Sequence, residues 1–250
     1  MPEFDVVGVG LNATDTLLIV PHFPAYAGKV PFEEEHLSPG GQVASAMVAC
    51  ARLGLRAKYI GAVGDDLRGR VQIESLEGTG INLDHLKRRE GCANQSAYIV
   101  IDRSTGERTV LWRRDDCLKV RPEEITEEMI SCGRHLHIDG HDTAAVARAA
   151  EIARRCGIPV TVDVDTIYKG FESVLPNVDY LVASSEFPAR IGIALAIRGT
   201  TTPSRWAITR GKGYASALSG SYCRASSRTR SRERRPALWS GIRFTVPTLR

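Results

Sequence analysis

The sequence contains no apolar run long enough to cross a membrane. No stretch approaches the roughly 20 consecutive apolar residues that a membrane-spanning helix needs. Residues 1–10 have neither a basic start nor a long apolar segment, so no signal peptide is expected. We therefore expect a cytoplasmic protein that has no membrane partner.

Closely spaced metal ligands are also missing. The six cysteines are scattered, none of them forms a CxxC pair, and no histidine cluster accompanies them. Zinc–thiolate sites need such spacing, so none is predicted. Because free cysteine is among the most buried residue types, we expect most of the six to be small buried hydrophobic residues: Cys50, Cys92, Cys117, Cys132, Cys156 and Cys223.

Excess basic charge is absent from most of the chain. Residues 221–250 contain eight arginines and one acid, Glu233, so they account for more than the whole formal net charge of +4. This segment shows no hydrophobic periodicity, which predicts an irregular Arg-rich tail. A run of arginines alone gives only salt-sensitive attachment to nucleic acid, so we expect no specific nucleic-acid partner.

Apolar segments with strand and helix character alternate along the chain. Strands are predicted at 4–9, 58–63, 135–139, 159–165, 180–183 and 205–209, and helices at 42–53, 65–76, 143–156 and near 171–175. The helix at 42–53 has small or apolar residues on nearly every face and is expected to be buried. This alternation predicts a mostly parallel sheet with helices on both faces.

Two segments, at about 17–37 and 95–114, interrupt this alternation. Pro21 and Pro24 punctuate the first segment, and proline is poorly tolerated inside a sheet. The second segment contains two apolar runs around Gly106, typical of a hairpin. We expect a small β-lid over one edge of the sheet, with 38–41 forming a turn before the helix.

Polar residues and glycines follow the first predicted strand and precede the first helix. In open α/β sheets, ligands bind beyond the carboxyl ends of the strands. Asn12 and Asp15 follow the strand at 4–9 and can hydrogen-bond a polyol, although an Asx-turn explains them equally well. Gly40 and Gly41 would let a ligand approach the backbone and the free N–H groups of the helix that follows.

These residues, taken together, resemble a known family. Residues 40–45 (GGQVAS) with 51–54 (ARLG), then 61–66 (GAVGDD) with Gly69, are similar to ribokinase-like (phosphofructokinase-B type) carbohydrate kinases. The resemblance covers roughly residues 4–188. It implies a three-layer α/β sandwich over 1–220, with a mostly parallel central sheet and a β-lid. It also implies ATP- and Mg²⁺-dependent phosphorylation of a hydroxyl on a small sugar or nucleoside. Exposed lid strands could pair between two subunits, giving a homodimer.

The resemblance also implies roles for individual residues near the first strand. Asp15 matches the acid that holds sugar hydroxyls, and Asn12 lies beside it. Gly40 and Gly41 match the diglycine that contacts the substrate. Ser45 stands where ribokinase has an asparagine, so the substrate preference is expected to differ.

Further site residues are expected at later strand ends. Asp139 and Asp165 follow two strands and are expected to contact the substrate, unless they are merely solvated. Glu186 matches the glutamate of an Asn-x-x-Glu element that works near the metal and the phosphates. Thr209 and Gly211 resemble a turn that touches the nucleotide.

The expected catalytic element is missing. Kinases of this family carry an Asp-Thr-x-Gly-Ala-Gly-Asp motif, in which the glycines form an anion hole and the last aspartate is the general base. The sequence has no aspartate after Asp179 and no Gly-Ala-Gly within 190–250. We therefore predict no catalytic residue and impaired kinase activity. A non-catalytic sugar-binding protein is the alternative.

The composition suggests one origin for this loss. The chain has 27 arginines and 6 lysines, which is typical of GC-rich coding DNA, and GC-rich DNA translated out of frame commonly encodes arginine, proline, serine and alanine. Residues 221–238 have this character. A frameshift in the gene is one hypothesis, and a genuine relative that binds without turnover is the other.

Overall fold

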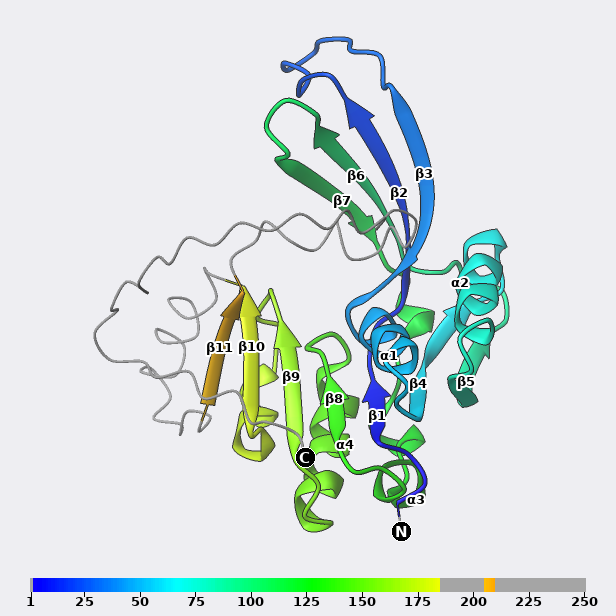
Figure 1. The fold of residues 1–250 in the computed structure, drawn as a ribbon, viewed down its shortest axis with the longest axis vertical. Helices are drawn as coiled ribbons and strands as arrows, with labels where there is room; N and C mark the ends of the chain where they lie inside the picture. The colour runs from blue at the N-terminus through cyan, green and yellow to red at the C-terminus, as the bar shows by residue number, and fades with distance from the viewer. Residues whose placement is uncertain (1, 185–204, 210–250) are drawn as a thin grey trace, which may run out of the picture. The chain divides into compact units, whose positions relative to one another are not determined.

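The computed structural model describes residues 2–184 and 205–209, which form two β-sheets and their connecting helices (Figure 1). Glu186, Gly211 and the Arg-rich segment 221–250 lie outside these residues, so the predictions made for them stay predictions. In the described part of the chain, no helix is long and apolar enough to cross a membrane.

The larger sheet has seven strands in the order β11-β10-β9-β8-β1-β4-β5. All its strand pairings are parallel, which confirms the predicted parallel sheet. β5 was not predicted, because this edge strand has no fully buried side chain and carries the charged sequence NLDHLKRR. The strands are β1 (Val6–Val9), β4 (Ala57–Gly64), β5 (Asn82–Arg89), β8 (Leu136–Ile138), β9 (Val160–Val164), β10 (Tyr180–Ser184) and β11 (Arg205–Thr209).

Helices cover both faces of this sheet. Successive residues of a strand point to opposite faces, so Val6 and Val7 of β1 enter two separate hydrophobic clusters. Val6 packs with Met47 of α1, and Val7 packs with Ile152 of α4. The three-layer prediction is therefore confirmed. The α-helices are α1 (Gln42–Arg52), α2 (Leu67–Glu77), α3 (Glu127–Ser131) and α4 (Thr143–Arg155), and the 3₁₀ turns are η1 (Asp116–Leu118), η2 (Pro122–Glu124), η3 (Phe171–Ser173) and η4 (Leu175–Asn177).

Helix α1 is not buried on every face, contrary to the prediction. Its fully buried residues are Val43, Ala44 and Met47, and Leu53 at its end is 81% exposed. The prediction was wrong because alanine favours helix formation at exposed and buried positions alike, so a run of small residues does not reveal which face is buried.

The smaller sheet, called here the lid sheet, has four strands in the order β3-β2-β6-β7. They are β2 (Ala13–Val20), β3 (Glu34–Gly40), β6 (Ser96–Asp102) and β7 (Arg108–Arg113). The predicted turn at 38–41 is wrong, because Ser38, Pro39 and Gly40 continue β3 and pair with β2. This edge strand tolerates proline, and pairing with distant residues overrides the local turn signal.

The β6–β7 hairpin of the lid sheet buries few side chains, whereas β2 buries four of its eight residues. All six residues of β7 are exposed, and only two of the seven residues of β6 are buried. The connections at the base of the sheet therefore contribute most to its position. The exposed large apolar residues of its strands and of the connection between β2 and β3 are Phe23, Tyr26, Phe32, Leu37, Tyr98, Val110, Leu111 and Trp112.

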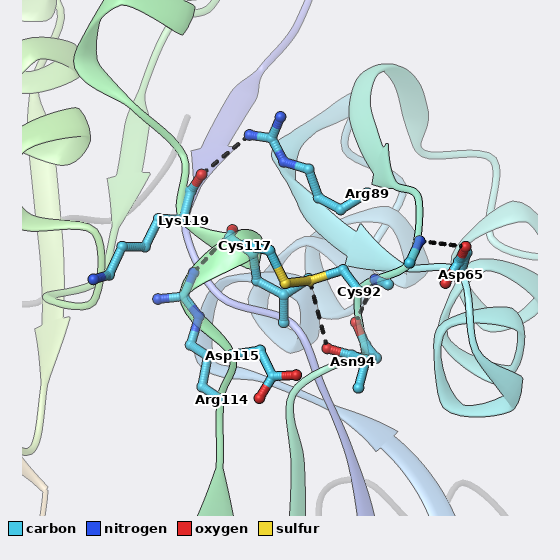
Figure 2. Close-up of a disulfide and its surroundings, with 12 residues drawn as sticks. Asp65, Arg89, Cys92, Asn94, Arg114, Asp115, Cys117 and Lys119 are labelled. Atoms are coloured by element: carbon cyan, nitrogen blue, oxygen red, sulfur yellow. Dashed lines mark hydrogen bonds between the residues drawn. A yellow bond between two sulfur atoms is a disulfide. The ribbon is translucent and has the colours of Figure 1, made fainter.

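The cysteines differ from the prediction. Cys92 and Cys117 form a disulfide, drawn in Figure 2. Cys50 and Cys132 are half-buried free thiols, and Cys156 is exposed. The expectation of mostly buried, unpaired cysteines was wrong, because spacing along a chain does not reveal which residues the fold brings together.

Candidate functional site

Asn12 lies in the connection between β1 and β2 and is only 2% exposed. Its Nδ2 donates hydrogen bonds to the Ala62 carbonyl (2.6 Å) and to the Tyr59 hydroxyl (3.1 Å), and the Tyr59 hydroxyl donates to the Gly10 carbonyl (2.8 Å). Asn12 Oδ1 is buried and accepts no hydrogen bond. A buried acceptor without a donor needs an explanation, and a ligand hydroxyl would provide one.

The two predicted glycines lie directly against Asn12 and Asp15. Gly41 has φ 98°, and a Cβ there would lie 2.4 Å from Asn12 Cα, so both the backbone angle and the space demand glycine. A Cβ on Gly40 would lie 2.7 Å from Asp15 Oδ2. The structure thus brings these four predicted residues together where α1 begins.

Asp15 is partly buried and lies near the positively charged side chain of Arg68. Burial raises its pKa to about 6, and the nearby charge of Arg68 opposes that shift. Arg68 reaches across from α2, where it donates to the Thr14 carbonyl (3.1 Å) and to Thr16 Oγ1 (3.1 Å). Its guanidinium also lies 5.3 Å from the Tyr98 ring centroid. At neutral pH, Asp15 is therefore mainly ionised and can accept hydrogen bonds from hydroxyls.

Asp139 is completely buried rather than solvated. Its carboxylate accepts hydrogen bonds from the backbone N–H groups of Leu11 (2.6 Å) and His141 (3.0 Å). Burial raises its pKa to about 6, although these two donors oppose the shift. Asp139 thus ties the end of β8 to the connection that carries Asn12.

An ion pair missed in the sequence joins the lid sheet to α4. Arg114, directly after β7, donates Nη1 and Nη2 to the two carboxylate oxygens of Asp142, each at 2.8 Å. Asp142 also accepts the Val120 backbone N–H at 3.0 Å. Both side chains are largely buried, with 13% and 7% exposure. The sequence offered one weak signal, the charged residue at the end of a predicted lid strand.

A neutral histidine lies next to this ion pair. Burial and the charge of Arg114 lower the pKa of His141 to about 4, while the charge of the exposed Asp165 opposes the shift. His141 Nε2 hydrogen-bonds the Tyr168 hydroxyl at 2.8 Å, and its ring makes an edge contact with Trp112 of β7. The structure therefore places Asp165 at the same end of the sheet as Asp139.

Ser45 and Thr209 are the other predicted residues in the described part of the chain, and Ser45 shares its pocket with Gly40. Ser45 lines a pocket of about 60 Å³, and Asn12, Asp15 and Asp139 are not among its lining residues. Thr209 is the last residue of β11, in register with Ser184 of β10. Among the described residues, no group of three or more His, Cys, Asp or Glu could hold a metal ion. The pocket is lined by Ser38, Pro39, Gly40, Ala44, Ser45, Val48, Arg52, Gln72 and Ser75.

The sequence is similar to those of known proteins. Residues 5–187 match the pfkB family carbohydrate kinases. The chain is 30% identical over 158 residues to the ATP-dependent ribose-1-phosphate kinase of Halopiger xanaduensis, covering 63% of this chain and 53% of that protein. It is 34% identical over 135 residues to the 5-dehydro-2-deoxygluconokinase of Geobacillus thermodenitrificans, covering 50% and 40% of the two chains.

A solved structure shows the same fold at lower identity. Arabidopsis thaliana ribokinase complexed with ribose and ATP superposes with a TM-score of 0.63 at 16% identity, covering 83% of this chain and 72% of that one. The matched part of this chain spans about half the length of the curated relatives. The family match extends over most of the chain, which therefore belongs to the pfkB family of carbohydrate kinases.

Proposed function

We propose that this protein binds a small sugar or nucleoside at the junction of β1, β2 and α1. The observation that carries the proposal is the buried, unpaired Oδ1 of Asn12, which lies with the Asp15 carboxylate around Gly40 and Gly41. Two hydroxyls on neighbouring carbons could donate to these two acceptors. The glycines leave space for the ring to approach the backbone.

We also propose that the family reaction of this site is ATP-dependent phosphorylation of a substrate hydroxyl. The matched relative from Halopiger xanaduensis is an ATP-dependent kinase, and the matched Arabidopsis structure holds ribose and ATP. When bound, ATP with Mg²⁺ would supply the γ-phosphoryl group. In this chain, Thr209 and Gly211 are the proposed nucleotide contacts and Glu186 the proposed metal contact. Asn12, Asp15, Gly40 and Gly41 hold and orient the substrate.

Turnover in this chain is proposed to be slow. Of the two carboxylates with raised pKa values at this site, Asp139 already accepts two backbone hydrogen bonds, and Asp15 is assigned to substrate binding. The sequence contains no Gly-Ala-Gly-Asp element to replace them as general base and anion hole. The second candidate function is therefore non-catalytic sugar binding on the same scaffold.

Calorimetry with a small ligand panel tests the binding proposal. Ribose, ribose 1-phosphate, fructose and adenosine would be titrated into the full chain, with and without a non-hydrolysable ATP analogue and Mg²⁺. We expect at least one to bind with a Kd below about 1 mM. Absence of binding by all four would contradict the proposal. Parallel measurement of ADP release distinguishes an active kinase from a binding protein.

Ligand affinity is expected to depend on pH through Asp15. If the ionised carboxylate accepts ligand hydroxyls, a pKa of about 6 makes the Kd at pH 5 about ten times the Kd at pH 7. The measurement is calorimetry at half-unit steps from pH 5 to pH 8. The variant Asp15→Asn should bind the ligand weakly, and its Kd should not change between pH 5 and pH 8. Asp139 has a similar pKa of about 6, so this variant shows which of the two carboxyls causes the pH dependence. An unchanged pH dependence in this variant would remove Asp15 from the site.

The same substitution is expected to stabilise the fold at neutral pH. Because the pKa of Asp15 is raised in the folded state, the native protein binds more protons than the unfolded chain between about pH 4 and pH 6. Stability contributed by this group therefore falls as pH rises through that range. Asp15→Asn should gain about 1–3 kcal/mol over wild type at pH 7.5 and less at pH 4. Urea unfolding at the two pH values checks this.

We propose a homodimer formed through the lid sheet and a cytoplasmic location. The support for the dimer is the exposed apolar surface of the lid sheet, including Leu111 and Trp112, and its two open edge strands. Sedimentation as a monomer at micromolar concentration would contradict the proposed dimer.

The proposed cytoplasmic location bears on the disulfide. Permanent structural disulfides are uncommon in a reducing cytoplasm, so the Cys92–Cys117 bond would have to be reversible in that compartment.

A further inference from the structure

The Cys92–Cys117 disulfide lies at the base of the lid hairpin formed by β6 and β7. Cys92 belongs to the connection between β5 and β6, and Cys117 lies in η1, just after β7. Figure 2 shows the bond between these two segments. The bond therefore links the chain that enters the hairpin to the chain that leaves it and closes residues 93–116 into a covalent loop.

Both ends of this loop continue directly into the candidate ligand site. Two residues after Cys92, Asn94 Oδ1 accepts the Gly64 backbone N–H (3.1 Å), and the next residue, Gln95, accepts the Thr14 N–H on its carbonyl (2.9 Å). Thr14 adjoins Asp15. Three residues before Cys117, Arg114 makes the ion pair with Asp142. The disulfide thus adjoins both sets of contacts that fix the hairpin relative to the site.

Apart from the main-chain pairing of β6 with β2, few buried contacts hold the hairpin. Every residue of β7 is exposed, and β6 has two buried residues. A hairpin with few buried apolar contacts opens at a low free-energy cost, so its position depends on the segments at its two ends. Loss of the covalent link would therefore increase the motion of residues 96–113 more than that of the larger sheet.

The two cysteine residues differ in exposure to solvent. Cys92 is 1% exposed, whereas Cys117 is exposed. Figure 2 shows Arg89, Arg114 and Lys119 near the pair, together with Asp65 and Asp115. The three cations are already paired with carboxylates, Arg89 with Glu124, Arg114 with Asp142 and Lys119 with Asp116. An incoming thiolate can therefore reach Cys117 more readily than Cys92, so Cys117 is the sulfur expected to be attacked first.

We propose that Cys92 and Cys117 form a reversible thiol–disulfide exchange site that controls ligand affinity by fastening or releasing the β6–β7 hairpin. A dithiol reductant attacks Cys117 Sγ through one thiolate, and the electron pair of the broken S–S bond passes to Cys92 Sγ, which takes up a proton. The second thiol of the reductant then displaces Cys117 from the mixed disulfide. The pair gains two electrons and two protons, and the reductant becomes a disulfide. The ligand-affinity part rests on the proposed function.

The test compares the full chain before and after reduction with dithiothreitol. Maleimide labelling of the denatured protein should show two additional modified cysteines after reduction. Hydrogen–deuterium exchange should accelerate about ten-fold or more in 96–113 and change little in 136–138 and 160–164. The Kd of whichever sugar or nucleoside binds should rise about ten-fold.

Variants separate this effect from general damage by the reductant. Cys92→Ser/Cys117→Ser should behave like the reduced wild type and no longer respond to dithiothreitol, while Cys156→Ser, at an exposed free cysteine, should respond like wild type. The inference is overturned if labelling shows no bond before reduction, or if exchange in 96–113 changes less than two-fold. If no ligand binds in either state, the proposed function fails, and the exchange measurement still decides whether the hairpin is released.

Discussion

Purified as this 250-residue polypeptide, the protein should release ADP in the presence of sugar about 10⁴-fold more slowly than a kinase of its family that carries the catalytic motif. A missing general base typically costs about 10²–10⁴ in rate, and a missing anion-hole donor about 10²–10³. Multiplied in full, the two losses would give about 10⁴–10⁷, and because the effects of groups that act together do not multiply fully, a loss near about 10⁴ is expected. A coupled ADP assay with ATP, Mg²⁺ and the four panel ligands measures it.

Binding under the same conditions is the control for this prediction. A ligand that binds by calorimetry but is not phosphorylated would support a site that has lost its catalytic element. Turnover of about 1–100 s⁻¹, which is ordinary for kinases, would contradict the prediction and require another residue to act as general base. Asp139 would then be the first candidate, since it is buried at this edge with a raised pKa.

Translation of the coding DNA in all three frames distinguishes the two origins of the loss. An Asp-Thr-x-Gly-Ala-Gly-Asp motif in another frame downstream of codon 185 would show that this chain is an altered form of a sugar kinase. In that case the activity belongs to the repaired sequence. If no frame contains the motif, binding without turnover becomes the better description.

The sequence predicted those features of the site that depend on local order. Gly40 and Gly41 precede a helix, and Asn12 and Asp15 follow a strand, so their positions along the chain indicated that they would meet. The parallel sheet with helices on both faces followed from the alternation of helical and β segments. The elements themselves needed only the periodicity of neighbouring residues and the known geometry of parallel sheets, whereas the substrate roles of these residues came from the resemblance to ribokinase-like kinases.

The features that were missed depend on contacts between distant residues. Arg114 and Asp142 are 28 residues apart, and Cys92 and Cys117 are 25 apart. Hydrophobic periodicity indicates which face of an element is buried, but not which charged or sulfur-bearing side chains will meet. The segment at 38–41 shows the same limit, because its turn-forming residues were recruited into β3 by pairing with β2.

Among substitutions, Arg114→Ala should cause the largest loss of stability, about 3–5 kcal/mol. Asp142 would keep the Val120 N–H but lose both guanidinium hydrogen bonds while remaining buried. A buried carboxylate without its cation costs more than the intact pair contributes, because its desolvation is no longer offset. Urea unfolding at pH 7.5 measures the change. The matched control is Arg113→Ala, whose side chain is 74% exposed and should cost less than about 1 kcal/mol.

Two further variants identify the cause of that loss. Arg114→Lys keeps the positive charge but cannot reproduce the two-pronged contact, so it should lie between wild type and Arg114→Ala. In Arg114→Ala/Asp142→Asn the uncompensated charge is gone, so the double variant should be less destabilised than the sum of the two single changes by about 1–3 kcal/mol. Additive effects would show that the two side chains act independently. A loss below about 1 kcal/mol in Arg114→Ala would show that the base of the lid hairpin is held by its other contacts instead.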